Sequence, residues 1–232
     1  MLPAPTRATY ANGASACSQR LRARAAPLLP QLLLGLMLLA AAPTAQAYIQ
    51  VLNNCGYAVT AFWRAGASTT YNRKLLPGES TQITLPNGVW IAGVVWGSRT
   101  GSINNGQATQ LEFTIGADVG GGKKQDFYDV SVINAYNTPA RIRPLNPPSI
   151  SGAWCGSPSC VISGLNSFCT TPNFLAGADP ACINRDGPGL LATSGTRAFK
   201  SKCPTAYTYS KDDTTSMFSC KWGTNYEVKF CP

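Results

Sequence analysis

The chain contains no histidine among its 232 residues. This absence excludes the Ser-His-Asp and Cys-His types of nucleophilic catalysis, and it excludes metal sites with imidazole ligands. It also removes the side chain most often used for proton transfer near neutral pH. Any catalysis by this chain must therefore come from carboxylates, lysine, tyrosine or a thiol, and we expect neither a metal nor a cofactor.

Acidic residues are absent from the first 47 residues, which contain four arginines. An apolar run, LLPQLLLGLMLLAAA, follows from Leu28 to Ala42, and the small-residue sequence Ala-Gln-Ala ends at Ala47. This order is typical of a secretory signal. A membrane anchor is the alternative, but Pro30 interrupts the run, which is shorter than the ~20 residues that a span needs. We therefore predict a signal peptide over residues 1–47 and a mature chain from Tyr48. It would be secreted to the extracellular space, apoplast or cell wall, without stable membrane insertion.

Long runs of basic residues are also absent. Residues 48–232 hold fifteen basic and ten acidic residues, a net charge of about +5, and no basic run exceeds two residues. Nucleic-acid binding would require a clustered basic stripe, so we expect no nucleic-acid partner. This charge supports no more than a weak attraction to anionic cell-surface material. We expect a monomer.

Cysteine is the informative residue that is present. Cys17 lies in the predicted signal, and no C-x-x-C spacing occurs, which argues against zinc. An even number of cysteines in an exported chain predicts a disulfide framework, here of four bridges, and spacing alone leaves all 105 pairings open. The eight cysteines are Cys55, Cys155, Cys160, Cys169, Cys182, Cys203, Cys220 and Cys231.

The rest of the chain predicts an all-β protein. Short β-branched and aromatic segments alternate with Gly, Pro and Asn turns, and no window shows an apolar stripe at helical spacing. We expect an antiparallel β-sandwich from residues 48–148 and 203–232, with residues 149–202 as a loop-rich subdomain stapled by disulfides. The predicted strands are Tyr48–Leu52, Ala58–Trp63, Gln82–Leu85, Val89–Trp96, Gln110–Ile115, Phe127–Ile133, Ala206–Tyr209, Met217–Lys221 and Tyr226–Phe230.

Three passages resemble the thaumatin-like family, the fifth group of pathogenesis-related proteins. They are NNCGYAV at 53–59, QDFYDVSVINAYNTP at 125–139, and the terminal CPTAYTYSKDD…FSC…NYEVKFCP at 203–232. The resemblance implies the β-sandwich with disulfide-rich loops that the strand pattern also predicts. The chain has fewer cysteines than full-length members of the family and looks closest to a shortened, cysteine-poor member. The implied pairs are Cys55–Cys231, Cys155–Cys220, Cys160–Cys203 and Cys169–Cys182.

The same resemblance implies an acidic cleft between the sandwich and the stapled loops. Arg99 matches the arginine of the family pattern, Glu112 the glutamate, and Asp129 and Asp212 two of its three aspartates. Asn134 stands where the remaining aspartate is expected, so the cleft should be one charge less acidic than in the fullest members. An arginine among the carboxylates would lower their pKa values.

Two kinds of chemistry fit these residues. Glycoside hydrolysis needs one protonated and one ionised carboxyl group, for which we select Glu112 as acid and Asp129 as nucleophile or base. Sugar binding without hydrolysis needs no difference in protonation between the two carboxyl groups. Flat faces for stacking on sugar rings would come from Phe127, Tyr128, Tyr207 or Tyr209. The leading hypothesis is a secreted defence protein that binds β-1,3-glucan. The alternatives are a weak endo-β-1,3-glucanase and a non-catalytic protein-interaction or enzyme-inhibitor module.

Each candidate also has a simple structural explanation. Glu112 would be an ordinary solvent-facing residue of a strand, and Arg99 would bond to loop carbonyls. Asp213 reads better as a turn residue than as part of a site. The tryptophans at 63, 90 and 96 lie in strand-like sequence, which favours the core or the sandwich edge.

Overall fold

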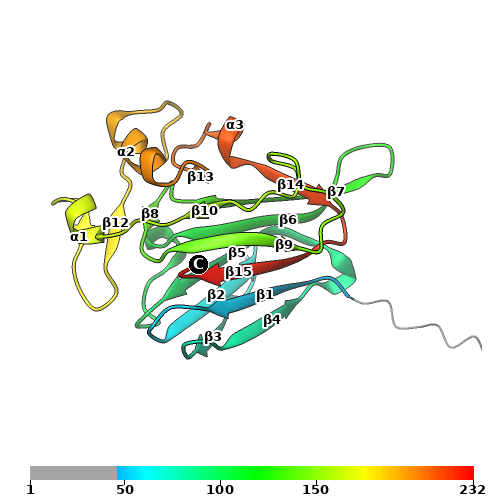
Figure 1. Cartoon of the computed structure of the whole chain (residues 1–232), viewed down its shortest axis with the longest axis horizontal. Helices are drawn as coiled ribbons and strands as arrows, with labels where there is room; N and C mark the ends of the chain where they lie inside the picture. Colours follow the sequence, from blue (N-terminus) through cyan, green and yellow to red (C-terminus); the bar gives the residue numbers. More distant parts are fainter. Residues whose placement is uncertain (1–45) are drawn as a thin grey trace, which may run out of the picture. The chain divides into compact units, whose positions relative to one another are not determined.

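The computed structural model describes residues 46–232. The predicted signal peptide lies outside these residues, except for Gln46 and Ala47. Two sheets pack face to face in this part of the chain (Figure 1). The five-stranded sheet has the order β10-β9-β15-β1-β4, formed by β1 (Tyr48–Asn53), β4 (Ser80–Thr84), β9 (Ala140–Leu145), β10 (Ser159–Cys160) and β15 (Asn225–Phe230).

The second sheet has seven strands and carries the acidic residues discussed below. Its order is β13-β7-β6-β5-β2-β3, and β14 also pairs with β7. Its strands are β2 (Val59–Ala65), β3 (Tyr71–Leu75), β5 (Trp90–Ser98), β6 (Gln110–Asp118), β7 (Lys124–Ser131), β13 (Ala206–Tyr207) and β14 (Phe218–Lys221). Two short 3-10 turns flank β5, namely η1 (Pro86–Gly88) and η2 (Asn105–Gln107).

The core lies between the two sheets because each strand turns alternate side chains inward. Phe113, Tyr128 and Tyr226 are fully or almost fully buried there. The rings of Tyr128 and Tyr226 have centroids 5.0 Å apart, and those of Phe113 and Tyr226 are 5.7 Å apart at a steep angle. Such aromatic pairs contribute roughly 0.5–1.5 kcal/mol each beyond the burial of their area. They fix the inward faces of β6, β7 and β15.

The two ends of the domain are joined. Strands β1 and β15 pair in parallel, with Val51 opposite Val228, and they lie side by side in Figure 1. The Cys55–Cys231 disulfide closes the same end. The sandwich is thus antiparallel except for this pair and the parallel pair of β13 with β7.

The four disulfides are the ones that the family resemblance implies: Cys55–Cys231, Cys155–Cys220, Cys160–Cys203 and Cys169–Cys182. Three of them involve residues 149–202. The first part of this segment runs along the sandwich to β10, whereas the part from α1 to α2 gathers at one end (Figure 1). This segment contains α1 (Leu165–Phe168), α2 (Ser194–Lys202), β11 (Phe174–Leu175) and β12 (Ala181–Ile183). Strand β12 pairs with β8 (Ala135–Tyr136), which attaches the segment to the end of the sandwich.

The structure adds elements that the sequence pattern did not predict. Strand β3 has four exposed residues out of five, and β9 alternates buried residues with arginines, so neither forms an apolar run. Helix α2 buries only Thr196 and Phe199, which is too little for an apolar stripe. Its start is set instead by Thr193, which forms a capping box with Thr196. No helix within residues 46–232 is long and apolar enough to cross a membrane.

Candidate functional site

Glu112 and Asp129 lie directly opposite each other on neighbouring strands. Strand β6 supplies Glu112, β7 supplies Asp129, and the two residues are cross-strand partners. Their chain neighbours Phe113 and Tyr128 are also partners and are buried in the core. Because successive side chains of a strand point to opposite faces, both carboxylates lie on the face directed away from the core. Directly opposed residues have Cβ atoms roughly 4.5–5.5 Å apart.

A row of residues continues this pair across the sheet. Val94 of β5 is the partner of Glu112 on one side and of Arg64 of β2 on the other. A cavity of about 460 Å³ lies over this row. Its lining combines acids, a cation and apolar side chains: Arg64, Asn105, Glu112, Thr114, Phe127, Asp129 and Met217, with the backbone of residues 92–94.

The electrostatics of the pair follow from burial. Burial raises the pKa of the Asp129 carboxyl well above its usual range, and the charge of Glu112 raises it further. Burial also raises the pKa of Glu112, although a hydrogen bond from the Ser131 hydroxyl opposes that rise. Two carboxylates at one site cannot both ionise easily. The pair therefore keeps a proton to higher pH than two isolated carboxyl groups would.

Two atoms of the cavity are buried without a partner. The Oδ1 atom of Asp129 is inaccessible to solvent and accepts no hydrogen bond within residues 46–232, although the residue as a whole is only half-buried. The Nε atom of Arg64 is in the same state. A buried polar atom left unpaired costs roughly 1–3 kcal/mol. Both atoms are shielded from solvent, so a ligand in the cavity would reach them only if the side chains of the wall moved.

Arg99 does not line this cavity. Strand β5 ends at Ser98, which is buried and donates a hydrogen bond to Asp179. Ser98 lies an even number of residues from Val94 and so shares the face of Glu112, whereas Arg99 has the opposite parity and follows the end of the strand. The exposed Arg99 guanidinium instead lies 3.7 Å from the centroid of the Tyr57 ring.

Asp212 is buried in a separate polar cluster. Its Oδ2 atom accepts hydrogen bonds from the Lys200 ammonium at 2.9 Å and from the backbone and hydroxyl of Thr208 at 3.0 Å each. Asn134 and Tyr209 are half-buried and also lie outside the cavity lining. The backbone oxygen of Asn134 accepts from Asn184, and that of Tyr209 accepts from Asp212.

Tyr207 connects Asp129 with the acidic turn. It pairs with Ser131, two residues after Asp129, and its hydroxyl donates to Asp213 Oδ1 at 2.8 Å. Burial raises the pKa of Tyr207, and the charges of Asp129, Asp213 and Asp212 contribute to the rise. Asp213 begins the short helix α3 (Asp213–Ser216), as expected for a turn residue, yet it is the more exposed of the two adjacent aspartates.

The structure thus brings Glu112 and Asp129 together and leaves Arg99, Asn134, Tyr207, Tyr209 and Asp212 outside the lining of the cavity. Sequence reasoning missed Arg64 and Met217, which line it. Arg64 is the residue directly after the predicted strand Ala58–Trp63. Only the pairing of β2 with β5 shows that it lies in the same row as Glu112.

The fold and this site define a small, disulfide-bonded β-sandwich protein with two opposed carboxyl groups at a cavity on one sheet. The thaumatin family matches residues 100–232. The chain is 32% identical to the pathogenesis-related 5 protein Cup a 3 of Hesperocyparis arizonica, over 78% of this chain and 98% of that protein. It is 34% identical to pathogenesis-related protein 5 of Arabidopsis thaliana, over 78% of this chain and 88% of that protein.

The chain therefore belongs to the thaumatin family and is a thaumatin-like protein of pathogenesis-related group five. Among solved structures, the protein elicitor MoHrip2 from Magnaporthe oryzae is similar, with a TM-score of 0.43 and 13% identity. That comparison covers 80% of this chain and 99% of the elicitor.

Proposed function

We propose that this chain is a secreted defence protein that binds cell-wall β-1,3-glucan through the cleft of Glu112 and Asp129, with antifungal activity as the consequence. Secretion is supported by the predicted signal peptide and by four disulfides, which persist in oxidising compartments. Defence is supported by the pathogenesis-related relatives.

The opposed carboxyl groups of Glu112 and Asp129, which line one cavity, are the observation that carries the proposal. A glucan presents hydroxyl groups along its whole length, and these can donate hydrogen bonds to carboxyl oxygens at the cavity. Because burial raises the pKa values of both carboxyl groups, the pair holds a proton to higher pH than isolated carboxyl groups, and in its protonated form it can donate one hydrogen bond as well as accept others.

The apolar lining complements these polar groups. Phe127 lies two residues before Asp129 and shares its face of β7, and Met217 is 44% exposed at the same cavity. The flat faces of sugar rings are bordered by C–H groups, which pack against such side chains. Arg64 adds a donor on the opposite side of Glu112. A cavity with an apolar wall and a few polar groups is typical of sites for uncharged ligands.

Calorimetric titration of a linear β-1,3-glucan oligosaccharide tests this proposal. We expect Asp129→Asn to weaken binding by roughly tenfold, since an amide NH2 group, which cannot accept a hydrogen bond, replaces one carboxyl oxygen and the negative charge is lost. Asp118→Asn is the matched control, because Asp118 is exposed at the end of the same hairpin and its carboxylate only accepts from Gly120. Equal losses in the two variants, or no loss in Asp129→Asn, would show that the cleft is not the glucan site.

The raised pKa values favour a second candidate, a weak endo-β-1,3-glucanase. A pair that shares a proton supplies the acid and the ionised group that glycoside hydrolysis needs, with Glu112 as acid and Asp129 as nucleophile or base. However, both residues project from one wall of the cleft, whereas glycosidase carboxylates flank the scissile bond. Binding therefore ranks first.

Release of reducing ends from linear β-1,3-glucan separates the two functions. The hydrolase predicts release by the wild-type chain that Glu112→Gln abolishes while oligosaccharide binding persists. Sedimentation of the chain with insoluble glucan, without reducing-end release, excludes hydrolysis and leaves binding intact.

A further inference from the structure

The edge of the sandwich at β3 and β4 carries two further cavities, which share only Arg64 with the cleft proposed above to bind glucan. One has a volume of about 640 Å³ and is lined by residues of β2, β3, β4 and β5, including Trp63 and Tyr71. The other, of about 460 Å³, lies against β1, β3 and β4 and includes Tyr48 and Arg73. Gln82 of β4 lines both, so the two cavities meet at that residue.

An aromatic pair lines the larger cavity. The rings of Trp63 and Tyr71 are stacked, with centroids 6.2 Å apart and planes 21° apart. Tyr71 is 57% exposed, which is unusual for a large aromatic side chain. Neither the Trp63 indole nor the Tyr71 hydroxyl forms a hydrogen bond within residues 46–232. Such a surface fits the apolar face of a sugar ring, with polar groups free at its rim.

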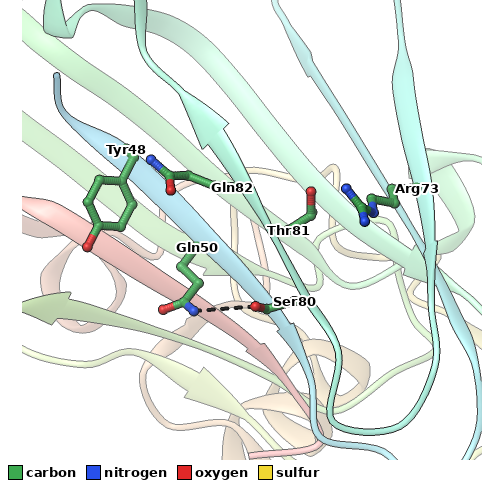
Figure 2. A pocket seen from close by; sticks show the side chains of 6 residues that line it. All are labelled: Tyr48, Gln50, Arg73, Ser80, Thr81 and Gln82. Atoms are coloured by element: carbon green, nitrogen blue, oxygen red, sulfur yellow. Dashed lines mark hydrogen bonds between the residues drawn. The ribbon is translucent and has the colours of Figure 1, made fainter. Parts of the chain in front are cut away.

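Amide and hydroxyl side chains line the smaller cavity. Figure 2 shows Gln50 beside Ser80, to which it donates a hydrogen bond of 3.4 Å, and Gln82 directed toward Tyr48. Arg73 reaches toward β4 from the neighbouring strand β3 (Figure 2). In the described part of the chain, Gln82 and Arg73 form no side-chain hydrogen bond or ion pair. These groups are therefore available to the hydroxyls and carboxylates of a ligand.

The charge of this surface has one sign. Arg64 lines the larger cavity and Arg73 the smaller, and no carboxylate lines either of them. Cross-strand pairing continues from Gln82 through Gln50 to Glu227 and then Arg143.

Glu227 adds little negative charge to this face. It accepts from Arg143 at 3.2 Å and from Arg141 at 3.4 Å, and Lys229 lies 3.9 Å away. Three cations thus surround one carboxylate, and the outer face of the five-stranded sheet retains a positive excess. A guanidinium recognises a carboxylate through paired hydrogen bonds, which a neutral glucan cannot offer.

We propose that the β3–β4 edge is a second carbohydrate site, specific for an acidic polysaccharide whose sugars carry carboxylates. Trp63 and Tyr71 take the sugar rings, Arg73 takes a carboxylate, and Gln82 bonds the hydroxyls between them. The site shares only Arg64 with the glucan cleft, and its ligand differs in charge, since the polysaccharide is anionic and the glucan is neutral. A single-stranded nucleic acid would also use cations and stacking, but the lining offers amides and hydroxyls suited to sugar hydroxyls in place of a continuous basic groove.

Binding of sodium polygalacturonate to the purified chain tests this assignment. We expect Tyr71→Ala and Arg73→Ala each to weaken binding by about five- to tenfold. Both residues are exposed, so these variants should unfold at the wild-type midpoint. Arg197→Ala removes an equal charge from the exposed face of α2 and is the matched control. We expect Arg197→Ala and Asp129→Asn to bind polygalacturonate like the wild type.

The competing outcomes are distinct. Equal weakening by Arg73→Ala and Arg197→Ala would mean that overall charge alone attracts the polymer, and the site would be refuted. Equal binding of fully methyl-esterified polygalacturonate would refute the role of the carboxylates. Tighter binding of a single-stranded oligodeoxynucleotide, lost in Tyr71→Ala, would replace the polysaccharide with nucleic acid. Loss of glucan binding in Asp129→Asn with polygalacturonate binding retained would show that the two sites are separate.

Discussion

Replacement of Asp126 by asparagine should change how the stability of the protein depends on pH. Asp126 lies in the core with no exposed surface, and its carboxylate accepts hydrogen bonds from the Gly116 backbone at 2.9 Å and the Tyr226 hydroxyl at 3.0 Å. Burial outweighs these bonds and raises the pKa of Asp126 from 3.8 to about 6. The folded state therefore binds this proton more tightly than the unfolded state.

The sign of the effect follows from this difference. Between about pH 4 and pH 6 the folded chain holds a proton on Asp126 that the unfolded chain has lost, so stability falls as the pH rises through this window. At about 1.4 kcal/mol for each pKa unit, the wild type loses up to roughly 3 kcal/mol through this group. Above about pH 6 the loss is complete and the contribution is constant.

Asp126→Asn removes the titration while keeping the shape of the side chain and an acceptor for Gly116. Urea unfolding of both proteins at pH 4 and pH 7, with the disulfides intact, measures the effect. We expect the stability of the variant relative to the wild type to increase by about 2–3 kcal/mol from pH 4 to pH 7. Other carboxylates, including Glu227 with its lowered pKa, titrate in both proteins and cancel in the difference. The same change in the free energy of unfolding between pH 4 and pH 7 for both proteins would refute the reasoning.

Three further predictions concern stability and are measured by urea unfolding. Cys55→Ser opens the disulfide that spans 176 residues and should cost about 4–5 kcal/mol in the chain-entropy model; a loss below about 1 kcal/mol would contradict a folding role for this bridge. Gly187→Ala would place a methyl group against the backbone oxygen of Ile133 and should lower the free energy of unfolding by about 2 kcal/mol. An unchanged urea midpoint would show that Gly187 does not lie against Ile133. Asp212→Ala leaves the half-buried Lys200 ammonium without its carboxylate partner and should lower the free energy of unfolding by about 2 kcal/mol. If the variant instead kept wild-type stability but lost glucan binding, Asp212 would be part of the glucan site.

The sequence predicts much of the sandwich because its inward residues alternate along short strands. The pairing of Glu112 with Asp129 could not be counted from the turn at 120–122, since Glu112 lies eight residues before Gly120 and Asp129 only seven after Gly122. A β-bulge between Thr114 and Ala117 takes up the extra residue and brings the two opposite each other. No local sequence pattern marks this bulge.

The other positions of the site depend on features that no local pattern encodes. Arg99 misses the cleft because β5 ends one residue earlier, after a register shift between Trp90 and Gly93. Asp212 is held by Lys200 of α2, a helix that begins at a cap and lacks an apolar stripe. Long-range pairing therefore decides which members of a sequence motif meet.

A structure of the chain bound to a linear β-1,3-glucan oligosaccharide tests the central claim most directly. We expect a sugar hydroxyl within hydrogen-bond distance of the Asp129 carboxyl group, with Glu112 contacting the same or the adjacent sugar and Phe127 packed against a ring face. An oligosaccharide that binds elsewhere and contacts neither carboxyl group would contradict it.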